Sequence, residues 1–312
     1  MRILVLGATG YLGTHVAERL RTLPGAAVFV GGRSLAADAR VDLAADRPQD
    51  LAAALAALAP DAVVNCAGAT GGDAVTLAEV NARGPAVLCA ALRDAAPGAR
   101  LVHLGSAAEY GPTDPAVRVT ESAATRPAGP YGATKLAGTV AVTASGLDAV
   151  VLRVGNPVGP GAPPTGLPGR VAALLAASLA DAGDDTEAVL RLGDLSAHRD
   201  FVDVRDVAWA ARRAVTAEGP LPPVLNIGGG DARPVRELVR TLADAAGFRG
   251  RIAEEEAGGS ARSAQVSWQC SDITAARDAL GWSPSHSLGA SLAALWAAAR
   301  PRAHTDEGVP AR

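Results

Sequence analysis

The chain has 312 residues, of which 49% are apolar and 20% charged, and this length favours one large domain that carries a smaller lobe. A formal net charge of −3 excludes the surplus of Lys and Arg that a nucleic-acid-binding surface needs. Apolar runs do not reach transmembrane length and the first residues are typical of a strand rather than a signal peptide, so we expect a cytoplasmic protein that binds neither nucleic acid nor membrane.

The first half of the chain alternates short apolar runs with helical patterns. Runs of buried-strand length cover residues 3–6, 27–30, 62–66, 101–104 and 150–153. Helical patterns cover residues 11–23, 49–58 and 77–95, and a further helix opens at Tyr131. Apolar strands without alternation are typical of a parallel sheet that is covered on both faces. The sequence therefore predicts an α/β fold with a doubly wound parallel Rossmann sheet.

After Asn156 this rhythm changes. Residues 155–169 are dense in Pro and Gly, which favours an irregular loop, and a helix (170–179) and short strands (189–192, 201–202) follow. Residues 224–227 are expected to return to the large sheet, and two or three helices follow Pro234. We expect residues 1–156 plus about 223–228 to form the Rossmann domain. Residues of about 157–222 and 229–300 would then form a smaller, discontinuous α/β substrate lobe, and 301–312 a disordered tail.

A glycine-rich turn directly follows the first strand and opens the first helix. Small residues at such a turn let the backbone approach a pyrophosphate, and the helix N-terminus supplies amide donors and the positive end of its dipole. The strand–turn–helix context predicts a dinucleotide site rather than simple steric accommodation. Its expected cofactor-binding residues are Gly7, Thr9, Gly10, Tyr11, Leu12 and Gly13.

The end of the second predicted strand bears on which dinucleotide binds. NAD-binding domains usually place an acidic residue there to hold the ribose 2′-hydroxyl. This chain has Arg33 instead, with no carboxylate before Asp38. Arg33 could bind a 2′-phosphate through charge-assisted hydrogen bonds of roughly 1.5–3 kcal/mol. The sequence therefore favours NADP(H) over NAD, with an exposed loop arginine as the alternative interpretation, and Asp42 and Leu43 are placed beside the adenine.

A tyrosine and a lysine lie one helical turn apart in Tyr131-Gly132-Ala133-Thr134-Lys135. An i, i+4 pair shares a helix face, so the phenol and the ammonium can point into one cleft. A nearby cation favours the phenolate and brings proton exchange toward neutral pH. Ser106 follows the 101–104 strand at its carboxyl end, where ligands collect in open parallel sheets. Ser106, Tyr131 and Lys135 are therefore the predicted catalytic residues.

Together these motifs resemble the extended short-chain dehydrogenase/reductase superfamily, which contains nucleotide-sugar epimerases, dehydratases and ketoreductases. The resemblance covers about residues 1–295. It rests on residues 7–13, on Asn81 within 79–84, and on residues 105–111, 130–135, 152–157, 199–207 and 225–230, together with Asp272 before 280–284.

The resemblance implies a role for each matching residue. Tyr131 would be the acid/base, Lys135 would tune it and hold the nicotinamide ribose, and Ser106 would orient the substrate. Arg199 and Arg262 would hold the pyrophosphate of a nucleotide sugar, because a guanidinium can bond phosphate oxygens bidentately. Further implied substrate contacts are Ala107 and Asn156, and further implied cofactor contacts are Cys66, Ala67, Gly68 and Asn81.

Departures from the family pattern indicate the reaction type. Dehydratases carry an Asp-Glu pair after the strand-end Ser or Thr, where this chain has Ala107-Ala108, so a dehydratase is not expected. Residues 106–111 and 199–207, with Arg33, are most similar to the 4-keto-6-deoxymannose reductase branch. The implied function is an NADPH-dependent reductase of a nucleotide-linked 4-keto (deoxy)sugar, in which hydride reaches C4 while Tyr131 protonates the oxygen. The family's Arg-x-Phe-Asn motif is altered to Arg-Val-Gly-Asn at residues 153–156, which leaves the substrate open.

Three alternatives remain at this level. They are an NAD-dependent nucleotide-sugar epimerase, a reductase or dehydrogenase of a non-sugar biosynthetic ketone, and a cofactor-sensing protein without catalysis. The nucleotide, the sugar and the face that is reduced stay open as well.

Cys66, Cys89 and Cys270 lack metal-ligand spacing, so no metal is expected. Helices 77–95 and 131–144 form the dimer surface in many members of the superfamily, so we expect a homodimer.

Overall fold

The computed structural model describes residues 1–182, 188–255 and 266–300. Its centre is a seven-stranded sheet of order β10-β6-β5-β4-β1-β2-β3, in which all neighbouring strands are parallel. The strands are β1 (Arg2–Leu6), β2 (Ala27–Gly32), β3 (Ala39–Arg40), β4 (Ala62–Asn65), β5 (Arg100–Ser106), β6 (Ala149–Val154) and β10 (Val224–Ile227). The expected doubly wound Rossmann sheet is confirmed.

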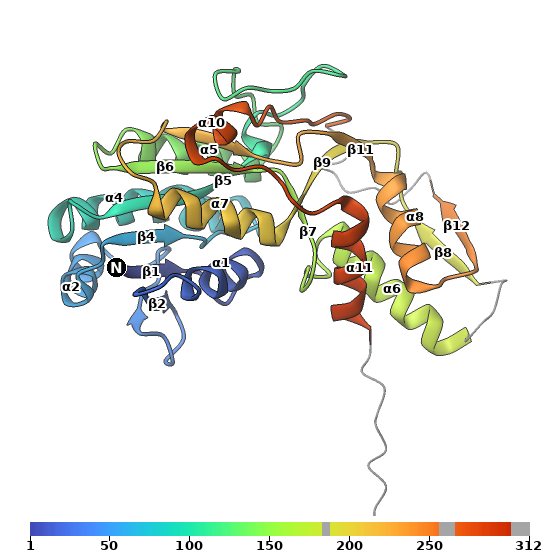
Figure 1. Ribbon diagram of the computed structural model, residues 1–312, viewed down its shortest axis with the longest axis horizontal. Coiled ribbons are helices and arrows are strands. Elements are labelled where there is room, and N and C mark those ends of the chain that lie inside the picture. Colours follow the sequence, from blue (N-terminus) through green and yellow to red (C-terminus); the bar gives the residue numbers. More distant parts are fainter. Residues whose placement is uncertain (183–187, 256–265, 301–312) are drawn as a thin grey trace, which may run out of the picture.

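Helices cover both faces of this sheet because apolar side chains of each strand point alternately to either side. Ile3 and Val5 share a core with α1 (Tyr11–Arg21), α7 (Val204–Thr216) and α10 (Thr274–Leu280). Leu4 and Leu6 face the opposite core, which is closed by α2 (Pro48–Leu58), α4 (Gly84–Ala95) and α5 (Pro130–Thr143). Figure 1 shows these layers.

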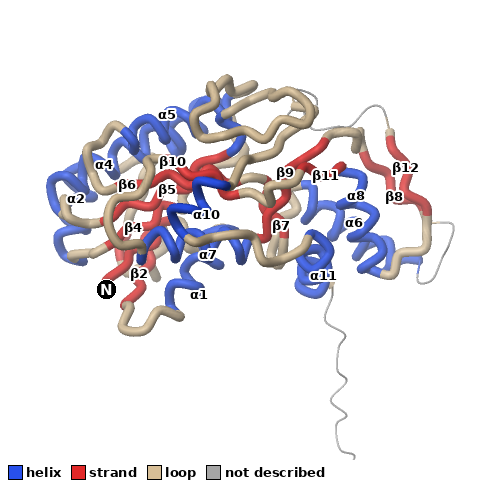
Figure 2. The backbone as a smooth tube through the Cα atoms, turned by 45° about the horizontal axis from the view of Figure 1, so that its top comes forward, coloured by secondary structure: helices blue, strands red, loops and turns tan. Residues whose placement is uncertain are grey.

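A smaller lobe lies beside the sheet and has a hydrophobic core of its own. Its helices are α6 (Leu167–Ala182), α8 (Val235–Ala246) and α11 (Leu288–Ala299), and its two-stranded sheet pairs β8 (Val189–Leu192) with β12 (Arg251–Glu254). A three-stranded sheet of β7 (Asn156–Val158), β9 (His198–Asp203) and β11 (Ala232–Pro234) lies between the lobe and the large sheet (Figure 2).

Two helices depart from the expected lobe ranges. The helices α7 and α10 fall within 157–222 and 229–300, yet both pack on the large sheet. The reason is the continuous apolar face of α7, which buries Val207, Ala211 and Val215 against the strands. The large domain thus draws on three separate parts of the chain: the first half, the stretch from α7 to β10, and α10.

The predicted helix over 77–95 is interrupted. The chain forms α3 (Ala74–Ala78), then a π-helical turn (Glu79–Arg83), and only then α4. Pro85 in the first turn of α4 has no N–H to donate to the carbonyl four residues earlier, which disfavours a regular α-helix through this point. The strands β3, β7, β11 and β12 are not predicted by the sequence, because none of them is a run of apolar residues.

Within the described residues, no helix combines the length and the apolar character needed to cross a membrane. The expected tail 301–312 and Arg262 lie outside the described residues.

Candidate active site

The glycine-rich turn lies at the switch point of the sheet, where β1 and β4 are neighbours and the chain winds away in opposite directions. Gly7 has a φ of 73°, and a Cβ there would lie 2.7 Å from the backbone nitrogen of Ala67. A Cβ at Gly13 would overlap the carbonyl oxygen of Gly7. Only glycine therefore allows α1 to begin so close to β1, and the resulting cradle of bare backbone at a helix N-terminus fits a pyrophosphate.

The end of β2 presents arginine side chains to solvent. Arg33 is exposed and forms no salt bridge in the described part of the chain. The carboxylate of Asp38 accepts a hydrogen bond from the backbone N–H of Val30 at 2.7 Å, two residues before β2 ends. Parallel pairing of β3 places the exposed Arg40 level with Gly32. Arg40 was missed in the sequence because β3 is only two residues long.

The π-helical turn holds two loops of the proposed cofactor site. Arg83 donates to the carbonyl oxygens of Leu43 at 3.1 Å and Ala44 at 2.9 Å, and so fixes the segment expected beside the adenine. Asn81 accepts from the N–H of Ala69 at 2.9 Å and donates to its carbonyl at 2.8 Å. One helical turn therefore fixes the loops after β3 and β4 together.

Ser106 ends β5 and caps the 3-10 turn Ala107–Glu109. Its Oγ accepts the N–H of Ala108 at 3.2 Å, and Oε1 of Glu109 accepts the N–H of Ser106 at 2.8 Å. This reciprocal capping box fixes the rotamer of the serine. Because the acceptor side of the hydroxyl faces the backbone, its O–H remains a donor for a ligand oxygen.

Lys135 is buried in α5, and its ammonium donates to the carbonyl oxygen of Leu104 at 2.6 Å. Burial lowers the pKa of Lys135 to about 8, and the carboxylate of Glu109 opposes that lowering. A Cβ at Gly68 would lie 3.8 Å from the ammonium nitrogen. The ammonium therefore lies between the carboxyl ends of β4 and β5.

Tyr131 lies in the first turn of α5 and is half-buried. This turn packs directly on the turn after β5, since a Cβ at Gly132 would lie 2.5 Å from the carbonyl oxygen of Ala108. The structure thus brings the segments that carry Ser106, Tyr131 and Lys135 to one edge of β5.

Two predicted substrate-binding residues, Arg199 and Asn156, lie in the three-stranded sheet, on β9 and β7 respectively. Arg199 is 9% exposed, and its guanidinium donates to the carbonyl oxygen of His198 at 2.8 Å. No carboxylate of the described residues forms a salt bridge with it, and burial lowers the pKa of its guanidinium. A buried cation of this kind favours a bound anion.

Asn156 is linked to the catalytic turn through a residue that sequence reasoning missed. Its side-chain amide donates to the carbonyl of Asp200 at 3.3 Å and to Oε1 of Gln269 at 3.1 Å. Gln269 in turn donates to the carbonyl of Ala107 at 2.9 Å. No motif signals Gln269, because it is brought here only by the tertiary fold.

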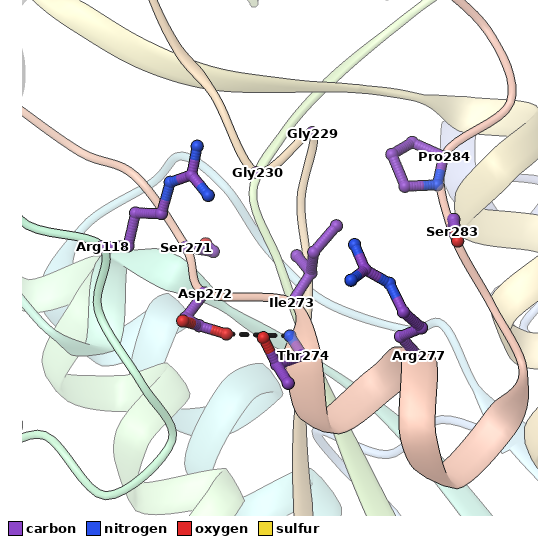
Figure 3. A pocket seen from close by; sticks show the side chains of 10 residues that line it. All are labelled: Arg118, Gly229, Gly230, Ser271, Asp272, Ile273, Thr274, Arg277, Ser283 and Pro284. Atoms are coloured by element: carbon purple, nitrogen blue, oxygen red, sulfur yellow. Dashed lines mark hydrogen bonds between the residues drawn. The ribbon is translucent and has the colours of Figure 1, made fainter.

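A solvent-open cavity of about 320 Å³ is lined by Gly229, Gly230 and residues 271–274, among others (Figure 3). The carboxylate of Asp200 accepts from the N–H groups of Gly230 at 3.0 Å and Ser271 at 2.9 Å, both in the cavity wall, and burial raises its pKa to about 6. Arg118 and Arg277 flank Asp272 in the same wall. Ser106, Tyr131 and Lys135 do not line this cavity.

Comparison with known proteins shows the family to which the chain belongs. A dTDP-6-deoxy-L-talose 4-dehydrogenase (NAD(P)(+)) from Kitasatospora kifunensis is 37% identical over 308 residues, which cover 95% of each chain. A GDP-6-deoxy-D-mannose reductase from Pseudomonas aeruginosa is 28% identical over 94% of this chain and 95% of its own length. The solved structure of RMD from Pseudomonas aeruginosa, complexed with NADPH, matches with a TM-score of 0.82 at 25% identity, over 96% of this chain and 98% of the other. The model of the NAD dependent epimerase/dehydratase family matches residues 3–228, and the chain belongs to this family of NAD(P)-dependent enzymes that act on nucleotide sugars.

Proposed function

We propose that the chain is an NADPH-dependent reductase of a nucleotide-linked 4-keto-6-deoxyhexose. The observation that carries the proposal is the meeting of Ser106, Lys135 and the first turn of α5 at the carboxyl end of β5. Only β4 separates β5 from β1 in the sheet, so a dinucleotide that extends from the cradle across the end of β4 would reach the same three side chains.

The three side chains can each assist carbonyl reduction. When bound, the reduced nicotinamide supplies hydride to the C4 carbon. Tyr131 donates a proton to the C4 oxygen, and Ser106 donates a hydrogen bond to the same oxygen. The Lys135 ammonium stabilises the phenolate that remains. Ala107 and Ala108 supply no acid or base after Ser106, which argues against elimination of water.

The substrate side of the proposal rests on Arg199. Its buried guanidinium suits a phosphate group, and the two curated relatives are named for activities on dTDP- and GDP-linked 6-deoxyhexoses. Arg262, the second arginine that we propose for the pyrophosphate, lies outside the described residues. The preference for NADPH rests on Arg33, with Arg40 beside it.

The test is turnover with defined sugar nucleotides. The protein is incubated with dTDP-6-deoxy-L-talose or GDP-6-deoxy-D-mannose and NADP⁺, and with the matching 4-keto sugars and NADPH, while the absorbance of the reduced nicotinamide is followed. We expect stoichiometric conversion with one nucleotide series. Absence of turnover, together with no rise in melting temperature with any nucleoside diphosphate in the presence of NADPH, would refute the proposal.

The same assay distinguishes an epimerase, which the family also contains. An epimerase interconverts the two C4 epimers without net change in the cofactor, because the hydride returns to the same carbon. Stoichiometric NADPH consumption is therefore the decisive observation.

We further infer a homodimer. Val75 of α3 and Val140 of α5 are 64% and 55% exposed, on two helices that contact each other. Exposed apolar side chains on adjoining helices favour a four-helix contact between two copies. Light scattering should give twice the chain mass for the wild type and the chain mass for Val140→Arg, and a monomeric wild type would contradict the inference.

A further inference from the structure

A buried carboxylate lies behind the proposed reaction centre and none of the catalytic roles above uses it. Glu109 is fully buried, and each of its oxygens has a partner. Oε1 accepts the N–H of Ser106 at 2.8 Å, and Oε2 accepts Nε of Arg153 at 2.7 Å. Arg153 in turn lies over the ring of Tyr110, 4.6 Å from its centroid.

The carboxylate of Glu109 occupies space that is free only because residue 105 is a glycine. A Cβ at Gly105 would lie 2.8 Å from Oε1 of Glu109 and 2.7 Å from Val151. The carbonyl of Leu104, which accepts the Lys135 ammonium, directly precedes Gly105. Lys135 and Glu109 therefore bond the two successive peptides that flank Gly105 in β5.

We infer that Glu109 is a positioning residue that acts on both partners of Tyr131: it holds Ser106 through the backbone and sets a fixed negative charge near the Lys135 ammonium. This inference rests on the proposed function, because it assigns Glu109 to the same site. Arg153 pairs with this carboxylate at 2.7 Å, and both side chains are buried.

The other groups around the ammonium do not supply this charge. They are Cys66 at the end of β4, His103 on β5 and Tyr131 on α5 itself. Burial raises the pKa of the Cys66 thiol to about 12, so the thiol is neutral. Burial lowers the pKa of His103, so its imidazole is neutral as well. The carboxylate of Glu109 is thus the negative charge that opposes the lowering of the Lys135 pKa by burial.

Lys135 is the only lysine in the chain, which allows a direct test. In protein labelled with ¹³C-lysine, the Cε signal reports the ionisation of this one side chain, without substrate. We expect a midpoint near pH 8 in the wild type. In Glu109→Gln the midpoint should fall by about one pH unit, because the opposing charge is lost. An unchanged midpoint would overturn the inference.

Two further variants keep the test decisive. Glu109→Gln leaves Arg153 buried without its partner, so Glu109→Gln combined with Arg153→Met removes both charges and should fold while showing the same lowered midpoint. Asp206→Asn removes a different buried carboxylate, which accepts from Ser285 and His286, and should leave the midpoint unchanged. A lowered midpoint in Asp206→Asn would attribute the effect to general loss of packing and overturn the inference.

The positioning of Ser106 by Glu109 is tested by steady-state kinetics, once a substrate that is turned over is known. At about pH 6, where Lys135 stays largely protonated with or without Glu109, Glu109→Ala should reduce kcat about tenfold in the otherwise wild-type protein and have little effect in Ser106→Ala, because the serine it positions is gone. Equal losses in both backgrounds would overturn this part. If the wild type reduces no sugar nucleotide, the proposed function fails, while the lysine titration still decides whether Glu109 controls the charge of Lys135.

Discussion

Replacing Arg33 by Ala should convert the protein from an NADPH-preferring to a less selective enzyme. Arg33 is exposed and forms no salt bridge within the described residues, so its removal breaks no internal contact. Its bonds to a 2′-phosphate would contribute roughly 1.5–3 kcal/mol, or about ten- to a hundredfold in Kd. Solvent and salt screen an exposed charge, which favours the lower end of this range. We therefore expect about a tenfold increase in Kd for NADPH.

A second exposed arginine, Arg40, allows the prediction for Arg33 to be tested with a double variant. Because Arg40 lies level with Gly32 on the neighbouring strand, Arg33→Ala should leave part of the preference, and Arg33→Ala with Arg40→Ala should remove most of it. Binding is measured by fluorescence titration with NADPH and NADH at low and high salt. Arg249→Ala removes an equally exposed arginine of the smaller lobe and serves as the control. If the ratio of the two dissociation constants is the same in Arg33→Ala as in the wild type, the assignment of the 2′-phosphate site is wrong.

Four further substitutions or conditions test the site. Tyr131→Phe should lower kcat about 10²–10⁴-fold and leave the Kd of NADPH unchanged, and full activity would defeat its role as proton donor. Because burial lowers the pKa of Lys135 to about 8 and the ammonium is the active form, kcat/KM should decline as pH rises through that value; a profile flat to about pH 10 contradicts this. Arg153→Met leaves the carboxylate of Glu109 buried and unpaired, so urea denaturation should give a free energy of unfolding lower by about 3–5 kcal/mol, and a loss below about 1 kcal/mol argues against the buried pair. Gly13→Ala should abolish NADPH binding in a calorimetric titration, because its Cβ overlaps the carbonyl at the start of the turn, and binding at wild-type affinity is inconsistent with the cradle.

The sequence by itself determined the fold class, the family and the segments that form the proposed active site. Apolar runs of strand length and the turn at residues 7–13 are local signals, because short stretches of chain decide them. The spacing of Tyr131 and Lys135 is local for the same reason, since one helical turn places both on one face. The Ser-x-x-Glu spacing of residues 106–109 is a capping-box signature, so the pairing of Ser106 with Glu109 is also a local signal.

Only the tertiary structure decided which distant residues complete the site. Arg153 reaches Glu109 from a neighbouring strand, and Gln269 reaches Ala107 across 162 positions of sequence. Sequence periodicity carries no information about such pairs, because they depend on strand order and on how helices pack on the sheet. The assignment of α7 and α10 to the large domain has the same cause: the apolar face of each helix is visible in the sequence, but the surface that it covers exists only once the sheet is assembled.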